Sequence, residues 1–185
     1  MNRFTRWCLS GFAIAAALAA VPTLPGVAQT GQGLTLFGGA DPDLRLPYRI
    51  QYNTPRNTRT RLFLRVPSDH VDRAISDITI SYPEAFEEYS GRFNVDEIKV
   101  HLGRDDRGQE LAVDEVVWDT EANQVDIYFV EDIPADTTFT VVMSRTRNPN
   151  RPLMQYWTLR AQSPGDALSF PVGVWNLSLA YETNR

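Results

Sequence analysis

Apolar and polar side chains alternate along most of this chain, with the period of two that is typical of β-strands. Each alternating run would turn one face towards a core and the other face towards water. The runs lie at residues 46–52, 62–66, 78–82, 98–102, 125–129, 139–143 and 175–181, and a further strand is expected around 156–159.

One stretch, ELAVDEVVWD, breaks this alternation. Leu111 and Val113 occupy odd positions, whereas Val116 and Trp118 occupy even positions. An extra residue in the strand would return all four side chains to one face. The break therefore predicts a β-bulge or kink near Asp114.

Turn-forming residues separate the runs, and helical patterns are short. Ser68 or Asp69 can cap a single helical turn, and a brief helix is expected between Pro83 and Gly91. The residues between the other runs are rich in Gly, Pro, Asn and Asp, which favour turns. The expected turns lie at residues 103–110, 119–124 and 131–138, and a longer polar loop lies at 52–59.

About nine or ten short strands with one or two short helical turns predict an all-β protein. The close spacing of the strands favours an immunoglobulin-like antiparallel β-sandwich, with a small β-barrel as the alternative. We expect this single domain at residues 33–182, after a short flexible segment at 29–32.

Residues 1–28 have the features of a secretory signal peptide. Arg3 and Arg6 make the start basic, an apolar run follows at 9–21, and the small residue Ala28 precedes the expected cut. The run is shorter than the ~20 residues of a membrane-spanning helix. We therefore expect an exported protein with no transmembrane segment after cleavage, located in the periplasm, at the cell surface or outside the cell.

The only cysteine, Cys8, lies within the expected signal peptide. The exported protein would then contain no disulfide, no thiol nucleophile and no thiolate metal site. An exported protein without disulfides fits a bacterial envelope or the exterior of the cell.

Charge is distributed unevenly along the chain. Residues 84–136 hold 16 acidic and 4 basic residues, a net charge of −12. The rest of the chain after residue 28 holds 7 acidic and 12 basic residues, a net charge of +5. The overall negative charge argues against nucleic-acid binding, which needs a basic surface, and the asymmetry predicts a polarised surface.

Several stretches, taken in order, resemble a known family. GLTLFGG opens the expected domain, and DITISYPEAF, VDEVVWDTEANQVDIYFVEDIPADTTFTVVMSRTRNP, YWTLRAQSPGD and VGVWNLSL follow. This order is similar to a family of small exported cyanobacterial proteins catalogued as domain of unknown function 2808. The resemblance runs from about Gly33 to Leu179. It implies export and an all-β domain, and it assigns no activity and no catalytic residue.

The segment RTRNPNRP is the main candidate for contact with an anionic ligand, together with the polar loop at 52–59. The favoured interpretation of the segment itself is a structural connection between strands, in which Asn148 and Pro149 form the turn and Arg145 keeps the inward position of its strand. Tyr128 has the parity of a surface aromatic, which would suit contact with a polysaccharide or protein. The candidate ligand-contact residues are Arg145, Arg147, Arg151, Arg56, Arg59 and Tyr128.

No cofactor is expected from the sequence, and calcium is the better candidate among metals. Asp105, Asp106 and Glu110 lie in a predicted turn, and calcium takes several oxygen ligands from flexible loops. Their spacing is not that of a twelve-residue calcium loop, so solvated turn residues are the alternative. The two histidines, His70 and His101, are expected to be exposed and are too few for a zinc or copper site.

The chain lacks the sequence motifs of hydrolases, such as Gly-x-Ser-x-Gly and His-Glu-x-x-His. Adjacent carboxylates such as Asp96 and Glu97 would face opposite sides of a strand, so they do not form an acid–base pair. We therefore predict a non-catalytic envelope or extracellular protein that binds protein or polysaccharide. The alternatives are a calcium-stabilised structural envelope protein and a hydrolase with dispersed carboxylates.

Overall fold

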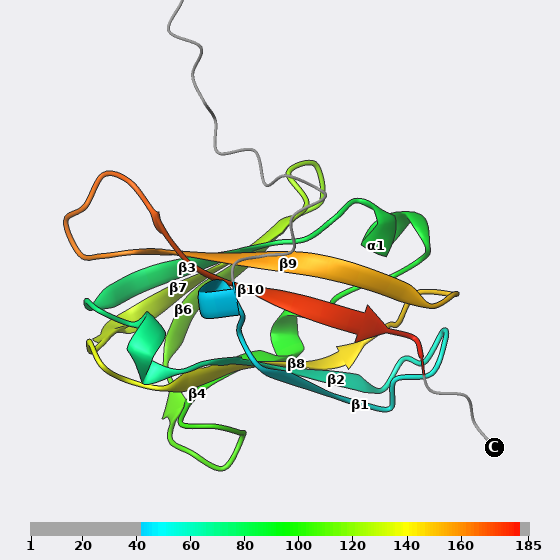
Figure 1. Cartoon of the computed structure of the whole chain (residues 1–185), viewed down its shortest axis with the longest axis horizontal. Coiled ribbons are helices and arrows are strands. Elements are labelled where there is room, and N and C mark those ends of the chain that lie inside the picture. Colours follow the sequence, from blue (N-terminus) through cyan, green and yellow to red (C-terminus); the bar gives the residue numbers. More distant parts are fainter. Residues whose placement is uncertain (1–41, 182–185) are drawn as a thin grey trace, which may run out of the picture. The chain divides into compact units, whose positions relative to one another are not determined.

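The computed structural model describes residues 42–181, which form two antiparallel β-sheets packed face to face (Figure 1). The expected signal peptide and the segment at 29–32 lie outside the described residues. The first sheet has the order β1 (Tyr48–Gln51), β2 (Thr60–Val66), β8 (Phe139–Thr146), β4 (Ile98–Leu102) and β5 (Glu110–Leu111). The second has the order β10 (Phe170–Leu179), β9 (Leu153–Gln162), β3 (Ile75–Ser81), β7 (Gln124–Ile133) and β6 (Val113–Asp119). The short helices are η1 (Pro42–Leu44), η2 (Ser68–His70), α1 (Ala85–Glu88) and η3 (Val95–Glu97).

The arrangement is an immunoglobulin-like antiparallel β-sandwich, as the alternation predicts. Consecutive strands repeatedly change sheets, as in the passages from β2 to β3 and from β7 to β8. Each sheet keeps two separate edge strands, β1 and β5 in the first and β10 and β6 in the second. The alternative of a closed barrel is therefore wrong.

The predicted inward positions form the core between the sheets. Leu64 lies opposite Val141 in the first sheet, and Ile80 lies opposite Val125 in the second. All four side chains are fully buried. Burying an aliphatic side chain of this size contributes about 1.5–3 kcal/mol, so strands of this alternation are held together chiefly by the facing apolar layers.

The chain changes sheets where the alternation breaks. β5 ends at Leu111 and pairs with β4, whereas β6 begins at Val113 and pairs with β7 of the other sheet. The register of β6 and β7 shifts between Val113 and Glu115, so the predicted bulge is confirmed. Leu111 and Val113 pack against the core with the same parity on either side of the change of sheet, and the bulge within β6 then moves the inward parity to Val116 and Trp118.

β1 keeps the predicted parity, because Ile50 pairs with the buried Leu62 and packs against the core, but this edge strand is incompletely covered. The alternation places Leu46, Tyr48 and Tyr52 on one inward face, but only Leu46 is buried. The hydroxyl of Tyr48 accepts a hydrogen bond from the backbone nitrogen of Ser178, at the edge of β10. Tyr52 has a φ of 57° and turns the chain outwards at the end of the strand, which leaves its side chain 60% exposed.

An aromatic cluster fills the part of the core beneath α1. The ring centroids of Tyr82, Phe86, Phe93 and Trp157 lie 4.7–5.7 Å from one another, mostly in edge-to-face contact. Such pairs add about 0.5–1.5 kcal/mol each to the gain from burial. Gly91 makes this packing possible, because a Cβ atom at that position would lie 2.7 Å from the ring of Phe86.

Tyr82 also forms a buried polar contact within this cluster. Its hydroxyl donates to Glu87 Oε1 (2.6 Å) and accepts from Trp118 Nε1 (2.6 Å). Burial, and then the hydrogen bond to Glu87, raise the pKa of the Tyr82 phenol well above its usual range. The stability that this neutral phenol contributes is fully present below the unfolded pKa of about 10 and is lost as the pH rises towards the folded pKa.

We expect the free energy of unfolding to fall as the pH rises above about 10, and to fall less steeply in Tyr82→Phe. The variant should also be less stable at neutral pH, by about 1–2 kcal/mol, because Glu87 and Trp118 lose a partner. Urea unfolding followed by circular dichroism, at a series of pH values, measures both effects. Tyr181→Phe, at an exposed phenol, is the matched control. Parallel pH profiles for Tyr82→Phe and the wild type would contradict the assignment.

Candidate functional site

The two predicted arginine loops, between β1 and β2 and between β8 and β9, lie side by side at one end of the sandwich (Figure 1). The backbone nitrogen of Arg56 donates to the carbonyl oxygen of Pro149 (3.0 Å). The backbone nitrogen of Asn148 donates to the carbonyl oxygen of Asn57 (2.8 Å). Segments that are far apart in the sequence therefore form one surface.

Asn148 holds this end of the sandwich together. Its side chain is fully buried, and Nδ2 donates to Asn53 Oδ1 (3.1 Å) and to the carbonyl oxygen of Thr54 (3.1 Å). Asn53 Oδ1 also accepts a hydrogen bond from the backbone nitrogen of Ala180 (2.8 Å), after β10. The segment RTRNPNRP thus has the structural role that the sequence favoured, and it also fixes the positions of neighbouring arginines.

Arg145 does not occupy the inward position predicted for it. It has a φ of 52°, its side chain is 71% exposed, and its Nη1 lies 3.3 Å from Glu97 Oε1. The pairing of β2 and β8 shifts register between Thr60 and Leu62, so Thr146 takes the buried position instead. The bulge, which parity counting cannot detect, explains the difference.

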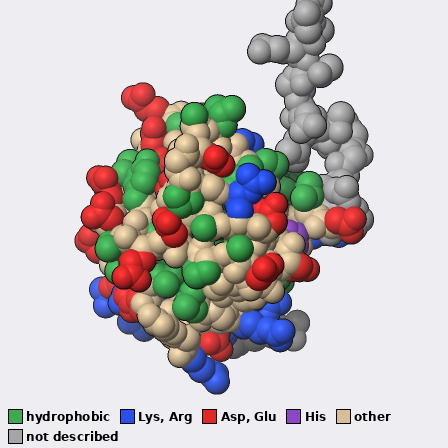
Figure 2. Space-filling model, turned by 90° about the vertical axis from the view of Figure 1, so that its left-hand side faces the viewer, with side chains coloured by type: hydrophobic (Ala, Val, Ile, Leu, Met, Phe, Trp, Pro, Cys, Tyr) green, Lys and Arg blue, Asp and Glu red, His purple; other side chains and the backbone are tan. Residues whose placement is uncertain are grey.

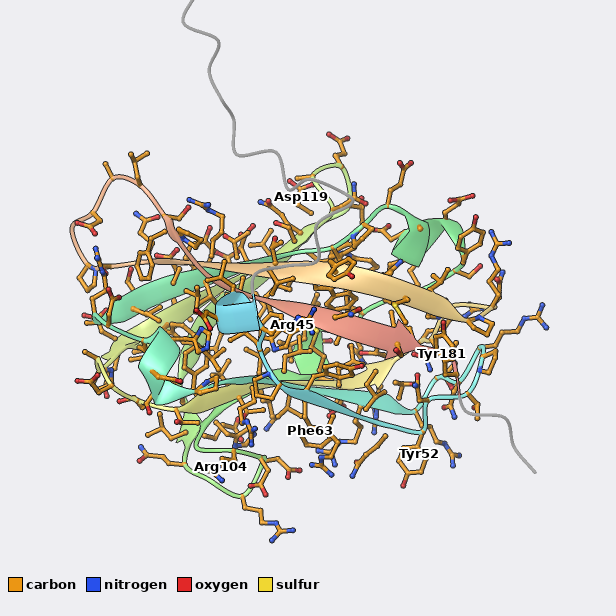
Figure 3. The ribbon with its side chains drawn as sticks, in the orientation of Figure 1. Arg45, Tyr52, Phe63, Arg104, Asp119 and Tyr181 are labelled. Atoms are coloured by element: carbon orange, nitrogen blue, oxygen red, sulfur yellow. The ribbon has the colours of Figure 1, made fainter. Side chains whose placement is uncertain are left out.

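The remaining loop arginines differ in their contacts. The guanidinium carbon of Arg151 lies 3.3 Å from the centroid of the Tyr89 ring, a cation–π contact. Arg56, Arg59 and Arg147 are exposed and form no ion pair within residues 42–181. We call this surface the arginine–tyrosine tip; it consists of Tyr52, Arg56, Arg59, Arg147, Arg151 and Tyr181, whose two tyrosines are labelled in Figure 3.

Tyr128 is exposed as predicted, but the structure does not bring it to the tip. It lies in β7 on the outer face of the second sheet, opposite Asp77 of β3 and Glu115 of β6. Desolvation, followed by the charges of Asp126, Asp77 and Glu115, raises the pKa of its phenol. Tyr128 therefore belongs to an acidic surface, separate from the candidate arginines.

The outer face of the first sheet carries a second arginine cluster, which sequence reasoning missed. Phe63 of β2 points outwards, yet only 2% of it is exposed. The guanidinium carbon of Arg49 lies 3.9 Å from the centroid of the Phe63 ring, and that of Arg61 lies 4.9 Å from it. Figure 3 shows Phe63 and Arg104 on this outer side of the sheet. The two guanidinium groups therefore cover the ring and are held by it.

Two shallow hollows open on this face. One of about 150 Å³ is lined by Tyr48, Arg49 and Phe63, and one of about 370 Å³ is lined by Ser68, Asp69 and Thr138, among others. Arg65 and Arg104 line both hollows, and neither forms an ion pair with another described residue. We call this surface the basic face; it consists of Arg49, Arg61, Phe63, Arg65 and Arg104.

The two outer faces of the sandwich differ in charge, as the uneven sequence predicts. In Figure 2, most of the visible Lys and Arg side chains lie along the lower border, on the side of the first sheet. Asp and Glu side chains lie mainly above and to the left of them. The basic face and the acidic surroundings of Tyr128 are thus on opposite sheets.

The carboxylates proposed for calcium have basic partners instead. Asp106 accepts a hydrogen bond from Arg61 (2.8 Å), which lowers the pKa of its carboxyl group. Glu110 accepts from Lys99 (2.9 and 3.1 Å). The carboxylate of Asp105 closes its own turn by accepting a backbone hydrogen bond. The three residues therefore do not converge on a common point.

Neither histidine is as exposed as expected. His101 is only 7% exposed, because the loop after β4 folds over it and brings the carbonyl oxygen of Gly108 to 3.3 Å from its Nδ1. His70 is half-buried beside the carbonyl oxygen of Val172 (3.1 Å). Within residues 42–181, no three His, Cys, Asp or Glu side chains are placed to hold a metal ion.

Another hollow, of about 820 Å³, lies around η2 and the start of β10. Asp69, His70 and Asp72 line it together with Arg73. Arg73 forms ion pairs with Asp72 (3.3 Å) and Asp166 (3.7 Å), so part of the acidic charge there is already balanced.

The fold and these surfaces define an immunoglobulin-like β-sandwich with an arginine–tyrosine tip and a basic face. The chain belongs to the family described as "Protein of unknown function (DUF2808)", which matches residues 34–179. No curated protein matches the sequence. Between residues 42 and 181, the structure has no helix of the length and apolar character needed to cross a membrane.

Solved structures with a similar fold share little sequence with this chain. The collagen-binding domain of a Staphylococcus aureus adhesin is 13% identical over 72% of this chain and 95% of its own, with a TM-score of 0.41. An uncharacterised immunoglobulin-like protein from Nocardia farcinica is 15% identical over 74% and 99%, with a TM-score of 0.37. A chain described as "Complete structure of manganese lipoxygenase of Gaeumannomyces graminis and partial structure of zonadhesin of Komagataella pastoris" is 13% identical over 74% of this chain, with a TM-score of 0.46. The match spans only 46% of that last chain, and these likenesses concern the general fold alone.

Proposed function

We propose that this protein is a non-catalytic binding module of the cell envelope, which recognises a protein or polysaccharide through the arginine–tyrosine tip. The observation that carries the proposal is the gathering of Arg56, Arg59 and Arg147 on two loops that Asn148 locks together. Loops on a rigid sandwich are a common place for binding residues. The placement in the envelope depends on the predicted signal peptide.

The rigidity of these loops favours binding. A loop that is already ordered loses less conformational entropy when a ligand binds. Tyr52 and Tyr181 flank the hydrogen-bonded pair formed by Asn53 and Ala180, and they add exposed aromatic rings to the charged groups. Aromatic and arginine side chains together are enriched in protein interfaces.

The local carboxylates support a binding role more than a catalytic one. Glu97 lies 3.3 Å from Arg145, and Glu87 lies 3.6 Å from Arg92 and accepts from Tyr82. These acidic groups are engaged in structural pairs. Among the described residues, no carboxylate forms an ion pair with Arg56, Arg59, Arg147 or Arg151, so these charged groups of the tip are available to a ligand.

The test is co-sedimentation of the purified protein with cell envelopes of the organism that encodes it. We expect the triple variant Arg56→Gln, Arg59→Gln, Arg147→Gln to bind at least about fivefold less, because each exposed ionic contact contributes up to about 1 kcal/mol. Envelopes treated with protease separate a protein ligand, which is lost, from a polysaccharide ligand, which is retained.

The matched control removes the same charge elsewhere, by Arg73→Gln, Arg107→Gln and Arg160→Gln. These arginines lie outside both the tip and the basic face and are at least partly exposed. Equal binding by the tip variant and the wild type, or an equal loss in the control, would reject the tip as the binding surface.

A further inference from the structure

The basic face has a regular geometry that the proposed tip does not use. Arg61, Phe63 and Arg65 are alternate residues of β2, so they point to the same side of the sheet. A rise of about 3.3 Å per residue places the Cα atoms of Arg61 and Arg65 roughly 13 Å apart along the strand. Arg49 lies opposite Phe63 in the neighbouring strand. The cations therefore form a row along the first two strands.

Two of these arginines are held in place before any ligand binds. Arg61 stacks on Phe63, donates from Nε to Ser144 Oγ (3.2 Å), and pairs with Asp106 (2.8 Å). Arg49 lies directly over the same ring. A guanidinium group stacked on an aromatic ring keeps its outer N–H donors available for planar anions such as carboxylate and sulfate.

Arg65 and Arg104 supply the charge that nothing else on this face balances. Both line the two hollows, and Asp69 is the one carboxylate among the described residues that line either hollow. Asp106, the other nearby acid, already accepts from Arg61. A ligand bound here would therefore meet Arg49, Arg65 and Arg104 with one opposing carboxylate.

The polarity of the face decides between kinds of partner. Phe63 and Val142 are the outward apolar residues at its centre, and each is only 2% exposed. The exposed large apolar residue on its border is Tyr48, which is among the residues that line the smaller hollow. A protein interface usually has an apolar core, and a membrane-binding surface has apolar residues that insert. The basic face lacks both features, whereas shallow polar hollows with one aromatic wall suit sugar rings.

We propose that the basic face binds a linear anionic polysaccharide, with its carboxylate or sulfate groups at Arg49, Arg65 and Arg104. The row of cations along β2 matches a chain that carries charges at repeated intervals. This site is separate from the arginine–tyrosine tip and does not depend on the function proposed for the tip.

The test measures binding of the purified protein to immobilised polygalacturonate and dextran sulfate by biolayer interferometry. Neutral dextran and polyglutamate are the comparison polymers. We expect the wild type to bind at least one of the two anionic polysaccharides, and to bind it more weakly as NaCl rises from about 0.05 to about 0.5 M. The variant Arg49→Gln, Arg65→Gln, Arg104→Gln should bind at least about tenfold more weakly.

The controls are the tip variant and the triple variant at Arg73, Arg107 and Arg160, which carry the same net charge as the face variant. Both should stay within about twofold of the wild type. If loss of Arg49 destabilises the fold by exposing Phe63, binding is measured instead with the double variant Arg65→Gln, Arg104→Gln, because neither of these side chains is stacked on the ring. A lower melting temperature of the triple variant would show that its fold is destabilised.

Three results would overturn the proposal. The first is that neither anionic polysaccharide binds. The second is an equal loss in the face variant and the two controls, which would indicate a general effect of charge. The third is binding of polyglutamate as tightly as of the polysaccharides, which would indicate an acidic protein as the partner. Failure of the tip experiment with envelopes leaves these outcomes unchanged, because the variants and the probes differ.

Discussion

Replacing Trp157 with Ala is expected to lower the free energy of unfolding by about 3–5 kcal/mol, the usual cost of truncating a large buried aromatic residue. Trp157 is fully buried and contacts the rings of Tyr82, Phe86 and Phe93. Its Nε1 also donates to the buried Gln155 Oε1 (3.0 Å). The substitution removes a ring that contacts the other three of the cluster and leaves Gln155 Oε1 without its partner.

Urea unfolding followed by circular dichroism measures this effect. Tyr156→Ala is the matched control, because Tyr156 is the adjacent residue, points to the opposite side of β9 and is 40% exposed. Its cost should be below about 1 kcal/mol. Trp157→Phe provides an intermediate value if Trp157→Ala does not fold, because it keeps a ring in the cluster. Similar losses of unfolding free energy for Trp157→Ala and Tyr156→Ala would show that the aromatic cluster does not stabilise the fold as proposed.

The second large effect is expected for Asn148→Ala, which should lose about 2–3 kcal/mol of stability. The side chain donates two buried hydrogen bonds, to Asn53 Oδ1 and to the carbonyl oxygen of Thr54. Truncation leaves both acceptors short of a donor and opens a space between the two loops. Because the loops carry Arg56 and Arg147, binding through the tip should weaken together with stability.

Asn150→Ala is the control, since Asn150 is exposed and its contact with Tyr89 is made by the backbone nitrogen. The free energy of unfolding of Asn150→Ala should equal that of the wild type. Hydrogen exchange gives an independent measure, because the backbone amides of Arg56 and Asn148 donate between the loops and should lose protection in Asn148→Ala alone. Wild-type protection in that variant would contradict the role of Asn148 as the link between the loops.

Charge is distributed unevenly over the surface of the protein. The basic face lies on the first sheet, the acidic residues around Tyr128 lie on the second, and the tip closes one end. A ligand with repeated negative charges would be attracted to one side and repelled from the other. The orientation of the protein on such a ligand would follow from this distribution.

The alternation of residue types was enough to predict the class of fold. It located the strands, and it also located the bulge in ELAVDEVVWD, because parity is a local property of the backbone. It was also enough to predict that Tyr128 is exposed. In each of these cases the direction of the side chain is set by the pleat of its own strand.

The local pattern failed where a residue depends on a distant segment. His101 has the parity of an exposed residue, but the loop that follows β4 folds over it. Arg145 has the parity of an inward residue, but a shift in the pairing of β8 with β2 turns it outwards. Asp106 and Glu110 looked like candidate calcium ligands, but they pair with basic residues from other strands.

The sequence by itself therefore determined which residues could face the core, the approximate positions of the strands and turns, and the excess of positive charge outside residues 84–136. Only the tertiary structure decided that Asn148 joins two loops and that Arg49, Arg65 and Arg104 share one face. The reason is physical. The period of a strand sets the direction of each side chain, whereas the neighbours of that side chain depend on which strands pair, and that is decided by packing of the two sheets as a whole.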